Sequence, residues 1–356
     1  PLKLSLDTEI QYLIREELIK FQEIFNSYGS TAILMNVNSG EILSMVSLPD
    51  FDLNKREDIS DKKFINRSTK GVYELGSVFK TFTLAAGLQQ NVIQEDTLFK
   101  NLPKKIKCAG RSISEYDMDI PSSLTAEEIL IRSGNIGSIK IAQKVGLENF
   151  KDFLENLDLL NKIQFDIEEV GNPIPFKWGK CKLATSAYGH GITTTPLQLA
   201  KAYAIIANGG YKIKPTLIKK EKNLKRGEQI ITQENSNKIN EILRKIVTSE
   251  QGTANLANIA GYEIAGKTGT AQKSIKGKYS KKKINTFASI FPISSPKYVL
   301  IVLLDEPKLS ETYIYEYNDG KKRKIIGTPF NTAGWTSVEV AKNIIEKIGP
   351  ILAIKY

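Results

Sequence analysis

Three short polar motifs lie far apart in this 356-residue chain, so a fold that uses them together has to bring three distant segments to one place. They are Ser77-Val78-Phe79-Lys80, Ser133-Gly134-Asn135 and Lys267-Thr268-Gly269. Ser133 follows Ser77 by 56 residues, and Lys267 follows Ser133 by 134 residues. The second and third patterns each occur once, and the order and wide spacing of the three make the set specific.

The first pattern, Ser-x-x-Lys, carries little information alone because it recurs elsewhere, for example at Ser60/Lys63 and at Ser280/Lys283. Those two copies lie in lysine-rich polar stretches. Ser77 instead follows Gly76 and opens a largely apolar run, 78–88, that is compatible with a helix. We therefore interpret Ser77 and Lys80 as the functional copy.

Ser77 and Lys80 have the spacing of a nucleophile and its base. A serine hydroxyl is a poor nucleophile until a neighbouring base takes its proton. Three residues apart on a helix, the two side chains share one face, and a place in the first turn favours an alkoxide over a protonated lysine. Burial and a cationic neighbour such as Lys267 lower a lysine pKa, which suits Lys80 to general-base catalysis. Ser133 is predicted to pass a proton between Lys80 or Lys267 and a leaving amine.

The remaining motif residues are predicted to bind substrate. The amide of Asn135 is suited to holding a peptide carbonyl. Lys267-Thr268-Gly269-Thr270 is expected on an edge strand, to which an extended peptide can add, and Gly269 lets a backbone approach closely. The hydroxyls of Thr268 and Thr270, together with Lys267, are expected to bind a terminal carboxylate.

Histidine and cysteine content limits the competing chemistries. A Ser-His-Asp triad would need His190, the single histidine, which lies between two glycines in a chain without a Gly-x-Ser-x-Gly segment. A packing role for His190 is therefore favoured over a catalytic one. No His-Glu-x-x-His pattern is present, so neither a metal nor another cofactor is expected. Cys108 and Cys181 either pair in an oxidising compartment or stay reduced.

The set Ser-x-x-Lys, Ser-x-Asn and Lys-Thr-Gly is typical of penicillin-binding proteins and class A β-lactamases. Similarity extends over nearly the whole chain through 73–80, 132–137, 188–200 and 266–272. The chain resembles the transpeptidase domain of class B penicillin-binding proteins, and most of all the division-specific septal branch. That family usually has Pro where Leu75 stands and a second Ser where Gly134 stands, and neither change removes a reacting atom.

The resemblance implies a peptidoglycan D,D-transpeptidase without a cofactor. The penultimate D-alanine of a stem peptide would acylate Ser77, terminal D-alanine would leave, and a neighbouring stem's amine would accept the chain. β-Lactams would acylate the same serine, and the backbone N–H groups of Ser77 and Thr270 would form the oxyanion hole. Alternatives are a D,D-carboxypeptidase, a serine β-lactamase, a penicillin-binding sensor without turnover, and a non-enzymatic module that docks wall polymer or a division partner.

The resemblance also implies a cellular location and a set of partners. It implies an inner-membrane anchor and a pedestal domain upstream of residue 1, with the catalytic domain in the periplasm. The expected partners are stem peptides, glycan strands derived from lipid II, β-lactams, a glycan polymerase and membrane proteins of the division complex. No apolar run of membrane-spanning length occurs in the chain itself.

Residue patterns predict an α/β (α+β) fold, an antiparallel sheet platform flanked by helices with a large all-helical insert, and the resemblance implies that this fold is of the β-lactamase/transpeptidase type. A helical stripe over 10–25 precedes a predicted hairpin, 31–37 and 41–47, and later strands are expected at 262–270, 285–292 and 298–304. The last helix carries Val338, Ala341, Ile344, Ile345 and Ile348. About 1–75 and 255–356 would form the platform, and about 76–254 a mainly helical subdomain with a capping box at 125–128 and Pro196 opening a helix. The cleft is expected between Lys267 on the sheet and Ser133.

The composition fits a globular enzyme with a basic surface. A hydrophobic content of 41% over 356 residues can build a sizeable core. The formal charge of +11 suggests nucleic-acid binding, but the lysines are spread along the chain, and we consider two dense clusters, 276–283 and 321–324. We interpret both clusters as solvated loops, the first a mobile loop near the cleft mouth, and expect no nucleic-acid partner.

Overall fold

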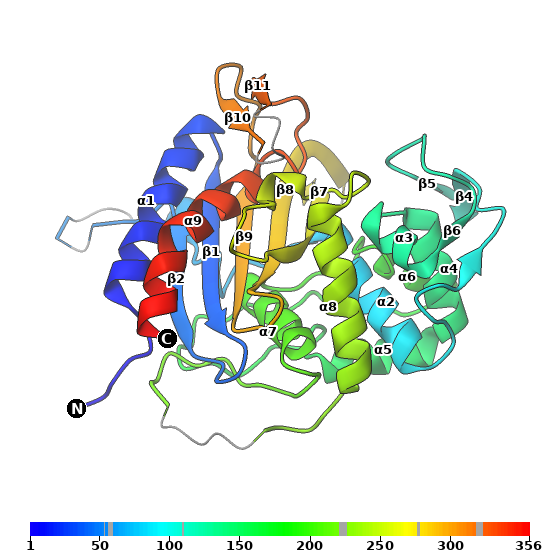
Figure 1. The fold of residues 1–356 in the computed structure, drawn as a ribbon, viewed down its shortest axis with the longest axis horizontal. Coiled ribbons are helices and arrows are strands. Elements are labelled where there is room, and N and C mark those ends of the chain that lie inside the picture. The colour runs from blue at the N-terminus through cyan, green and yellow to red at the C-terminus, as the bar shows by residue number, and fades with distance from the viewer. Residues whose placement is uncertain (53, 56–59, 109, 221–225, 276–277, 318–322) are drawn as a thin grey trace.

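A five-stranded antiparallel sheet with the strand order β2-β1-β9-β8-β7 forms the centre of the molecule (Figure 1). The computed structural model describes residues 1–52, 54–55, 60–108, 110–220, 226–275, 278–317 and 323–356. The strands are β1 (Gly29–Asn36), β2 (Ile42–Leu48), β7 (Ala265–Ile275), β8 (Lys278–Phe291) and β9 (Tyr298–Asp305). The two ends of the chain thus supply the sheet, as predicted, and β7 is an edge strand.

Helices cover the sheet. Every residue of β9 is buried, which requires packing on both of its faces. Helices α1 (Thr8–Ile24) and α9 (Ser337–Lys355) pack against each other and on the sheet, while α7 (Pro196–Ala207) packs on β1, β8 and β9 (Figure 1). The predicted apolar stripes of α1 and α9 are buried in this core.

The middle of the chain forms a helical part beside β7 (Figure 1). Its helices are α2 (Lys80–Gln89), α3 (Ala126–Ile131), α4 (Asn135–Val145), α5 (Leu147–Asn156), α6 (Lys180–Ser186) and α8 (Gln233–Thr248), the last of which contacts β7, α2 and α3. Both predicted helix starts are confirmed, because Thr125 and Glu128 form a capping box and Pro196 opens α7. In the part of the chain that the structure describes, no helix is long and apolar enough to cross a membrane.

The insert is not purely helical. Residues 98–125 contain two small two-stranded sheets, β3 (Leu98–Phe99) with β6 (Leu124–Thr125) and β4 (Lys105–Cys108) with β5 (Arg111–Ser114). The strands of the β4–β5 pair are four residues long and partly exposed, so they lack the long apolar alternation by which strands are recognised. Helix α7 also departs from the predicted division, because it packs on the sheet although it lies within 76–254.

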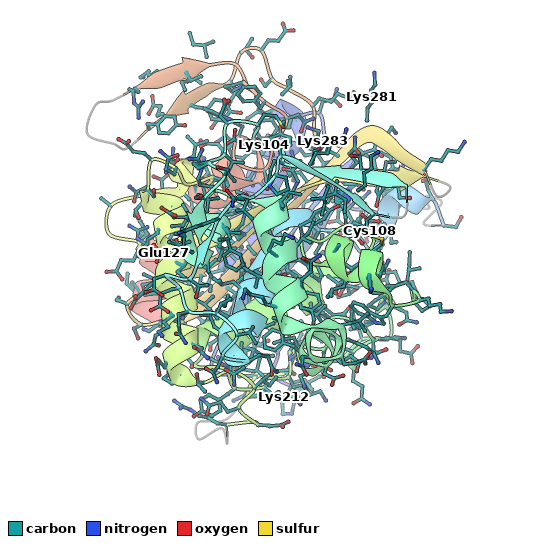
Figure 2. All side chains as sticks on the ribbon, turned by 90° about the vertical axis from the view of Figure 1, so that its right-hand side faces the viewer. Lys104, Cys108, Glu127, Lys212, Lys281 and Lys283 are labelled. Carbon is teal, nitrogen blue, oxygen red and sulfur yellow. A yellow bond between two sulfur atoms is a disulfide. The ribbon has the colours of Figure 1, made fainter. Side chains whose placement is uncertain are left out.

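The prediction of a loop over the lysine-rich stretch 276–283 is wrong for the part of it that the structure describes. Residues 278–283 belong to β8, whose first part pairs with β7 out to Ile275, and residues 276–277 lie outside the described residues. Figure 2 shows Lys281 and Lys283 on this arm of the sheet. In the second cluster Lys324 begins β11 (Lys324–Ile326), which pairs with β10 (Ile314–Glu316), while residues 321–322 are not described.

Candidate active site

The three motifs meet at one cavity of about 410 Å³. It is lined by Ser77, Lys80, Ser133, Asn135, Thr268 and Thr270, together with residues of the β5–α3 connection and of segments 188–190 and 250–253. The turn that enters α2 together with the first residue of α2, the junction between α3 and α4, and β7 supply one motif each. The predicted cleft between the sheet edge and the helical part is therefore present.

Ser77 sits in a 3₁₀ turn, η2 (Gly76–Phe79), and not in the first turn of an α-helix as predicted, because α2 begins at Lys80. Gly76 has φ +62°, a conformation that favours glycine, and a Cβ there would lie 2.8 Å from the carbonyl oxygen of Thr270. The turn is therefore held closely against β7. Ser77 remains at the N-terminal end of the continuous η2–α2 segment.

Two buried lysines share one serine hydroxyl. Lys267 Nζ donates to Ser133 Oγ at 2.9 Å and to the carbonyl oxygen of Thr268 at 3.1 Å. Lys80 Nζ donates to the same Ser133 Oγ at 3.2 Å, and also to the carbonyl oxygen of Ser133. The exposed fractions are 2% for Lys80 and 0% for Lys267, so neither ammonium is solvated by bulk water. The hydroxyl of Ser133 thus links the two lysines.

Burial disfavours the charged form of both lysines. It lowers the pKa of Lys80 to about 7, although the nearby charge of Glu115 raises it. Burial also lowers the pKa of Lys267 well below its ordinary value, and the positive charge of Lys80 lowers it further. A proton can therefore be taken up and released at this pair near neutral pH.

Ser133 is held in a strained conformation between α3 and α4. Its φ is +59°, in the left-handed region that non-glycine residues rarely adopt. The next residue, Gly134, has φ −65° and ψ 129°, an extended conformation open to any residue. A Cβ at Gly134 would lie 3.1 Å from Ile120 Cδ1, so a serine here requires only a small shift of that side chain. The backbone at 134 therefore accommodates either the glycine of this chain or the serine of the family pattern.

Asn135 is fixed by contacts on both sides of its amide. Its Oδ1 accepts from Lys80 Nζ at 2.7 Å, and its Nδ2 donates to the carbonyl oxygen of Ser114 at 2.8 Å. Its backbone N–H donates to Glu115 Oε2 at 2.6 Å, and Ile136 N–H donates to Glu115 Oε1 at 2.8 Å. Glu115 was missed from the sequence. Its carboxylate satisfies the first N–H groups of α4 and lines the cavity beside Lys80.

The hairpin that carries Ser114 is joined to another wall of the site by a disulfide. Cys108 on β4 and Cys181 on α6 are bonded, with their Cα atoms 5.5 Å apart. The sequence left this pairing open. Figure 2 shows Cys108 on the side of the molecule that carries the helical part. The bond ties the anchor of Asn135 to the helix that precedes the cavity residues Tyr188 and His190.

Strand β7 presents two hydroxyls to the cavity. Thr268 Oγ1 lies 2.7 Å from Thr253 Oγ1, and Thr270 Oγ1 accepts from Ala333 N–H at 2.9 Å. Gly269 packs closely against the chain itself. A Cβ at Gly269 would lie 2.2 Å from the carbonyl oxygen of Leu75, so the glycine allows the segment that enters η2 to approach β7.

His190 both packs and lines the cavity. Its ring lies between Tyr188 and Tyr279, with centroid separations of 5.1 and 5.4 Å. Its Nδ1 is 3.7 Å from Glu74 Oε2, and Glu74 also accepts from Tyr279 Oη at 3.0 Å. The packing role expected for His190 is therefore present, and the structure adds a place in the same cavity wall as Ser77.

Comparisons with known proteins agree with this geometry. The family model described as penicillin binding protein transpeptidase domain matches residues 30–331. A probable peptidoglycan D,D-transpeptidase FtsI of Caulobacter vibrioides is 32% identical over 100% of this chain and 59% of its own length. The peptidoglycan D,D-transpeptidase FtsI of Escherichia coli is 30% identical over 88% of this chain and 53% of its own length. The chain thus spans little more than half of these relatives.

A solved structure gives the same result for the fold. The transpeptidase domain of Burkholderia pseudomallei penicillin-binding protein 3 superposes with a TM-score of 0.83 and 26% identity, covering 99% of this chain and 96% of that one. The matched family spans most of the chain, including all three motifs. This chain belongs to the penicillin-binding protein transpeptidase domain family.

Proposed function

We propose that this chain is the catalytic part of a peptidoglycan D,D-transpeptidase that cross-links stem peptides through an acyl-enzyme on Ser77. The observation that carries the proposal is the hydroxyl of Ser133 between two buried lysines, in a cavity that also exposes Ser77. A proton relay of this kind suits a reaction in which a serine first loses a proton and a leaving amine then gains one. The names of the relatives support peptidoglycan as the substrate.

Each motif residue has a role in this proposal. Lys80 takes the proton of Ser77, and Ser133 with Lys267 delivers a proton to the leaving D-alanine. Asn135 uses one N–H for Ser114, and its second N–H is left to donate to a carbonyl of the stem peptide. Thr268, Thr270 and Lys267 bind the terminal carboxylate of the donor.

Backbone groups complete the site. The N–H groups of Ser77 and Thr270 stabilise the oxyanion, where one lost donor typically costs about 10²–10³ in rate. Gly269 keeps η2 against β7, and this contact holds the two donors near each other. The position of β7 at the sheet edge supports docking of the donor peptide as an added strand.

The biological setting is part of the proposal. It comprises septal cell-wall synthesis, an inner-membrane anchor and pedestal upstream, a periplasmic catalytic domain, and contacts with a glycan polymerase and division proteins. The disulfide between Cys108 and Cys181 supports an oxidising compartment. Similarity to the peptidoglycan D,D-transpeptidases FtsI of two species supports the septal role.

Intact-protein mass spectrometry after incubation with benzylpenicillin tests the proposal. A long-lived adduct that peptide mapping places on Ser77 is expected, and Ser77→Ala should remove it while unfolding at nearly the same temperature. Rapid return to the free mass with drug consumption would instead indicate a β-lactamase. Turnover of a stem-peptide analogue to hydrolysis product alone would indicate a carboxypeptidase, and an adduct without turnover of the analogue a sensor. Absence of any adduct would refute the assignment.

A further inference from the structure

The single histidine of the chain lies in the wall of the catalytic cavity. His190 follows α6 in the segment 188–191 and lines the same cavity as Ser77 and Lys80. Its Nδ1 faces Glu74 Oε2 at 3.7 Å, and Glu74 precedes Ser77 by three residues on the segment that enters η2. An imidazole and a carboxylate therefore stand beside the nucleophile, apart from the lysine–serine relay.

The second half of the proposed reaction needs a base that this relay does not obviously supply. An amine acceptor reaches the acyl-enzyme as an ammonium ion at neutral pH, and it cannot attack until it loses a proton. Lys80 and Lys267 both donate to Ser133, and in the proposed relay they transfer protons from Ser77 and to the leaving group. A second group that accepts a proton from the incoming ammonium would separate the two tasks.

We propose that His190 is that base, and that Glu74 attracts the acceptor ammonium and orients the imidazole. The inference rests on the proposed transpeptidase function and adds how the site selects an amine over water. In the step, Nδ1–H of His190 faces Glu74 and Nε2 takes one proton from the ammonium. His190 thus lines an acceptor subsite for a primary ammonium group, and the negative charge of Glu74 lies behind the imidazole.

The atoms and charges of the step balance. After His190 has taken one proton, the neutral amine attacks the ester carbon of acyl-Ser77, so that a C–N bond forms and the bond to Ser77 Oγ breaks. The second proton of the nitrogen passes to Ser77 Oγ through Lys80 and Ser133. His190 then releases its proton to solvent, which leaves an amide, a free serine and the resting site.

The surroundings of His190 keep it neutral in the resting enzyme. The titratable groups near it from the packed segments are Glu74, Lys80, Lys182, Tyr188 and Tyr279. Burial lowers the pKa of His190, the positive charge of Lys80 lowers it too, and Glu74 opposes both effects. Lys182 is engaged elsewhere, since its ammonium donates to the carbonyl of Gly191 and lies 3.7 Å from the Phe176 ring centroid. A neutral imidazole with a carboxylate behind it is the form that accepts a proton.

The test compares two acceptors on one acyl-enzyme. A thioester analogue of the stem peptide acylates the protein, and the ratio of aminolysis to hydrolysis products is measured with D-alanine, a charged amine, and with hydroxylamine, which is largely uncharged at neutral pH. Both products come from the same acyl-enzyme, so their ratio does not depend on how fast it forms. In His190→Gln the ratio with D-alanine should fall at least about tenfold, while the ratio with hydroxylamine stays within about twofold.

The pH profile and a second variant add independent readouts. In His190→Gln the rate of aminolysis by D-alanine should rise about tenfold per pH unit, because only the free amine then reacts. Glu74→Gln should raise the KM for D-alanine but not for hydroxylamine. It should also shift the His190-dependent limb of the pH–rate profile for aminolysis to lower pH, because Glu74 raises the pKa of His190. Equal losses with both acceptors would overturn the proposal, since His190 would then only shape the cavity. Failure of the unmodified protein to form an acyl-enzyme on Ser77 would instead refute the proposed function.

Discussion

Lys267 Nζ lies 2.9 Å from Ser133 Oγ, although 134 residues separate the two along the chain. This contact joins the sheet edge to the helical part across the cavity. It places a lysine with a strongly lowered pKa where no exposed surface remains to solvate it. The catalytic cavity thus retains two buried lysines, Lys80 and Lys267, which hydrophobic residues of similar size would replace at lower cost in stability.

The first prediction concerns this stability cost. Lys267→Met should slow acylation by benzylpenicillin by about 10²–10³, in the range expected for loss of a proton-transfer or oxyanion group, and should raise the unfolding temperature. The folded-state pKa of Lys267 is lowered, so between that pKa and the ordinary lysine pKa the unfolded chain binds one more proton than the folded chain. Within this window the stability of the wild-type protein rises with pH. The advantage of the variant should therefore shrink towards alkaline pH in calorimetric scans. A variant less stable than wild type at neutral pH would contradict this.

The second prediction concerns the rising limb of the pH–rate profile for acylation, which the pKa of Lys80 should set. Its neutral form is the base, and burial lowers its pKa to about 7. The acylation rate should therefore rise as the pH increases through about 7 and then level off. Quenched-flow mass spectrometry at several pH values measures this limb. Lys80→Ala should slow acylation by about 10²–10⁴ and abolish the limb, and survival of the limb in that variant would assign it to another group.

The third prediction separates the two functions of Glu115. Glu115 accepts the N–H groups of Asn135 and Ile136, and its charge raises the pKa of Lys80. Glu115→Gln keeps one acceptor but loses the charge, so the acylation limb should move to lower pH. Glu115→Ala should also misplace Asn135 and lower the plateau rate about tenfold or more. Glu115→Asp, which keeps the charge, serves as the control, and an unshifted limb in Glu115→Gln would argue for a purely structural carboxylate.

The fourth prediction concerns the disulfide between Cys108 and Cys181. The bond closes a loop of 73 residues and ties the Ser114 anchor of Asn135 to α6. Reduction should lower stability by up to about 4 kcal/mol on the chain-entropy account. It should also slow acylation several-fold, because the hairpin that holds the Asn135 amide loses its tether. Unfolding and acylation are compared with and without a reductant. The double variant Cys108→Ala/Cys181→Ala is the control. Its stability and acylation rate should match those of the reduced protein and should not change when reductant is added.

The meeting of the motifs could be predicted because each carries its chemistry in its residue types. Ser77, Lys80, Ser133 and Lys267 were identified from their residue types, from their spacing and order, and from the resemblance to a known motif set, and the structure brings them to one place. Helix starts at Thr125 and Pro196 were also predictable, since caps depend on four neighbouring residues. Because such helix starts depend on neighbouring residues, the structure has them where the sequence predicts them.

The errors have a common physical origin in contacts between distant segments. Glu115 lies 20 residues before Asn135 in no recognisable pattern, and only the hairpin brings its carboxylate to α4. The strand at 278–283 resembles a solvated loop because its residues are mostly exposed on both faces, which removes the alternation that marks a half-buried strand. The 3₁₀ start of the Ser77 segment is set by its contact with β7, which no local propensity records.

The last prediction concerns Gly269, which packs against the segment that enters η2. A Cβ at this position would lie 2.2 Å from the carbonyl oxygen of Leu75 and 3.0 Å from Val78 Cγ1, so Gly269→Ala has to push η2 away from β7. That shift separates Ser77 from Thr270, and acylation should fall by about 10²–10³, as for a lost oxyanion donor. Gly179→Ala is the matched control, because a Cβ there meets no atom within 4 Å and its φ of 174° suits any residue. If Gly269→Ala acylates as fast as Gly179→Ala, the close packing of η2 on β7 does not set the geometry of the nucleophile.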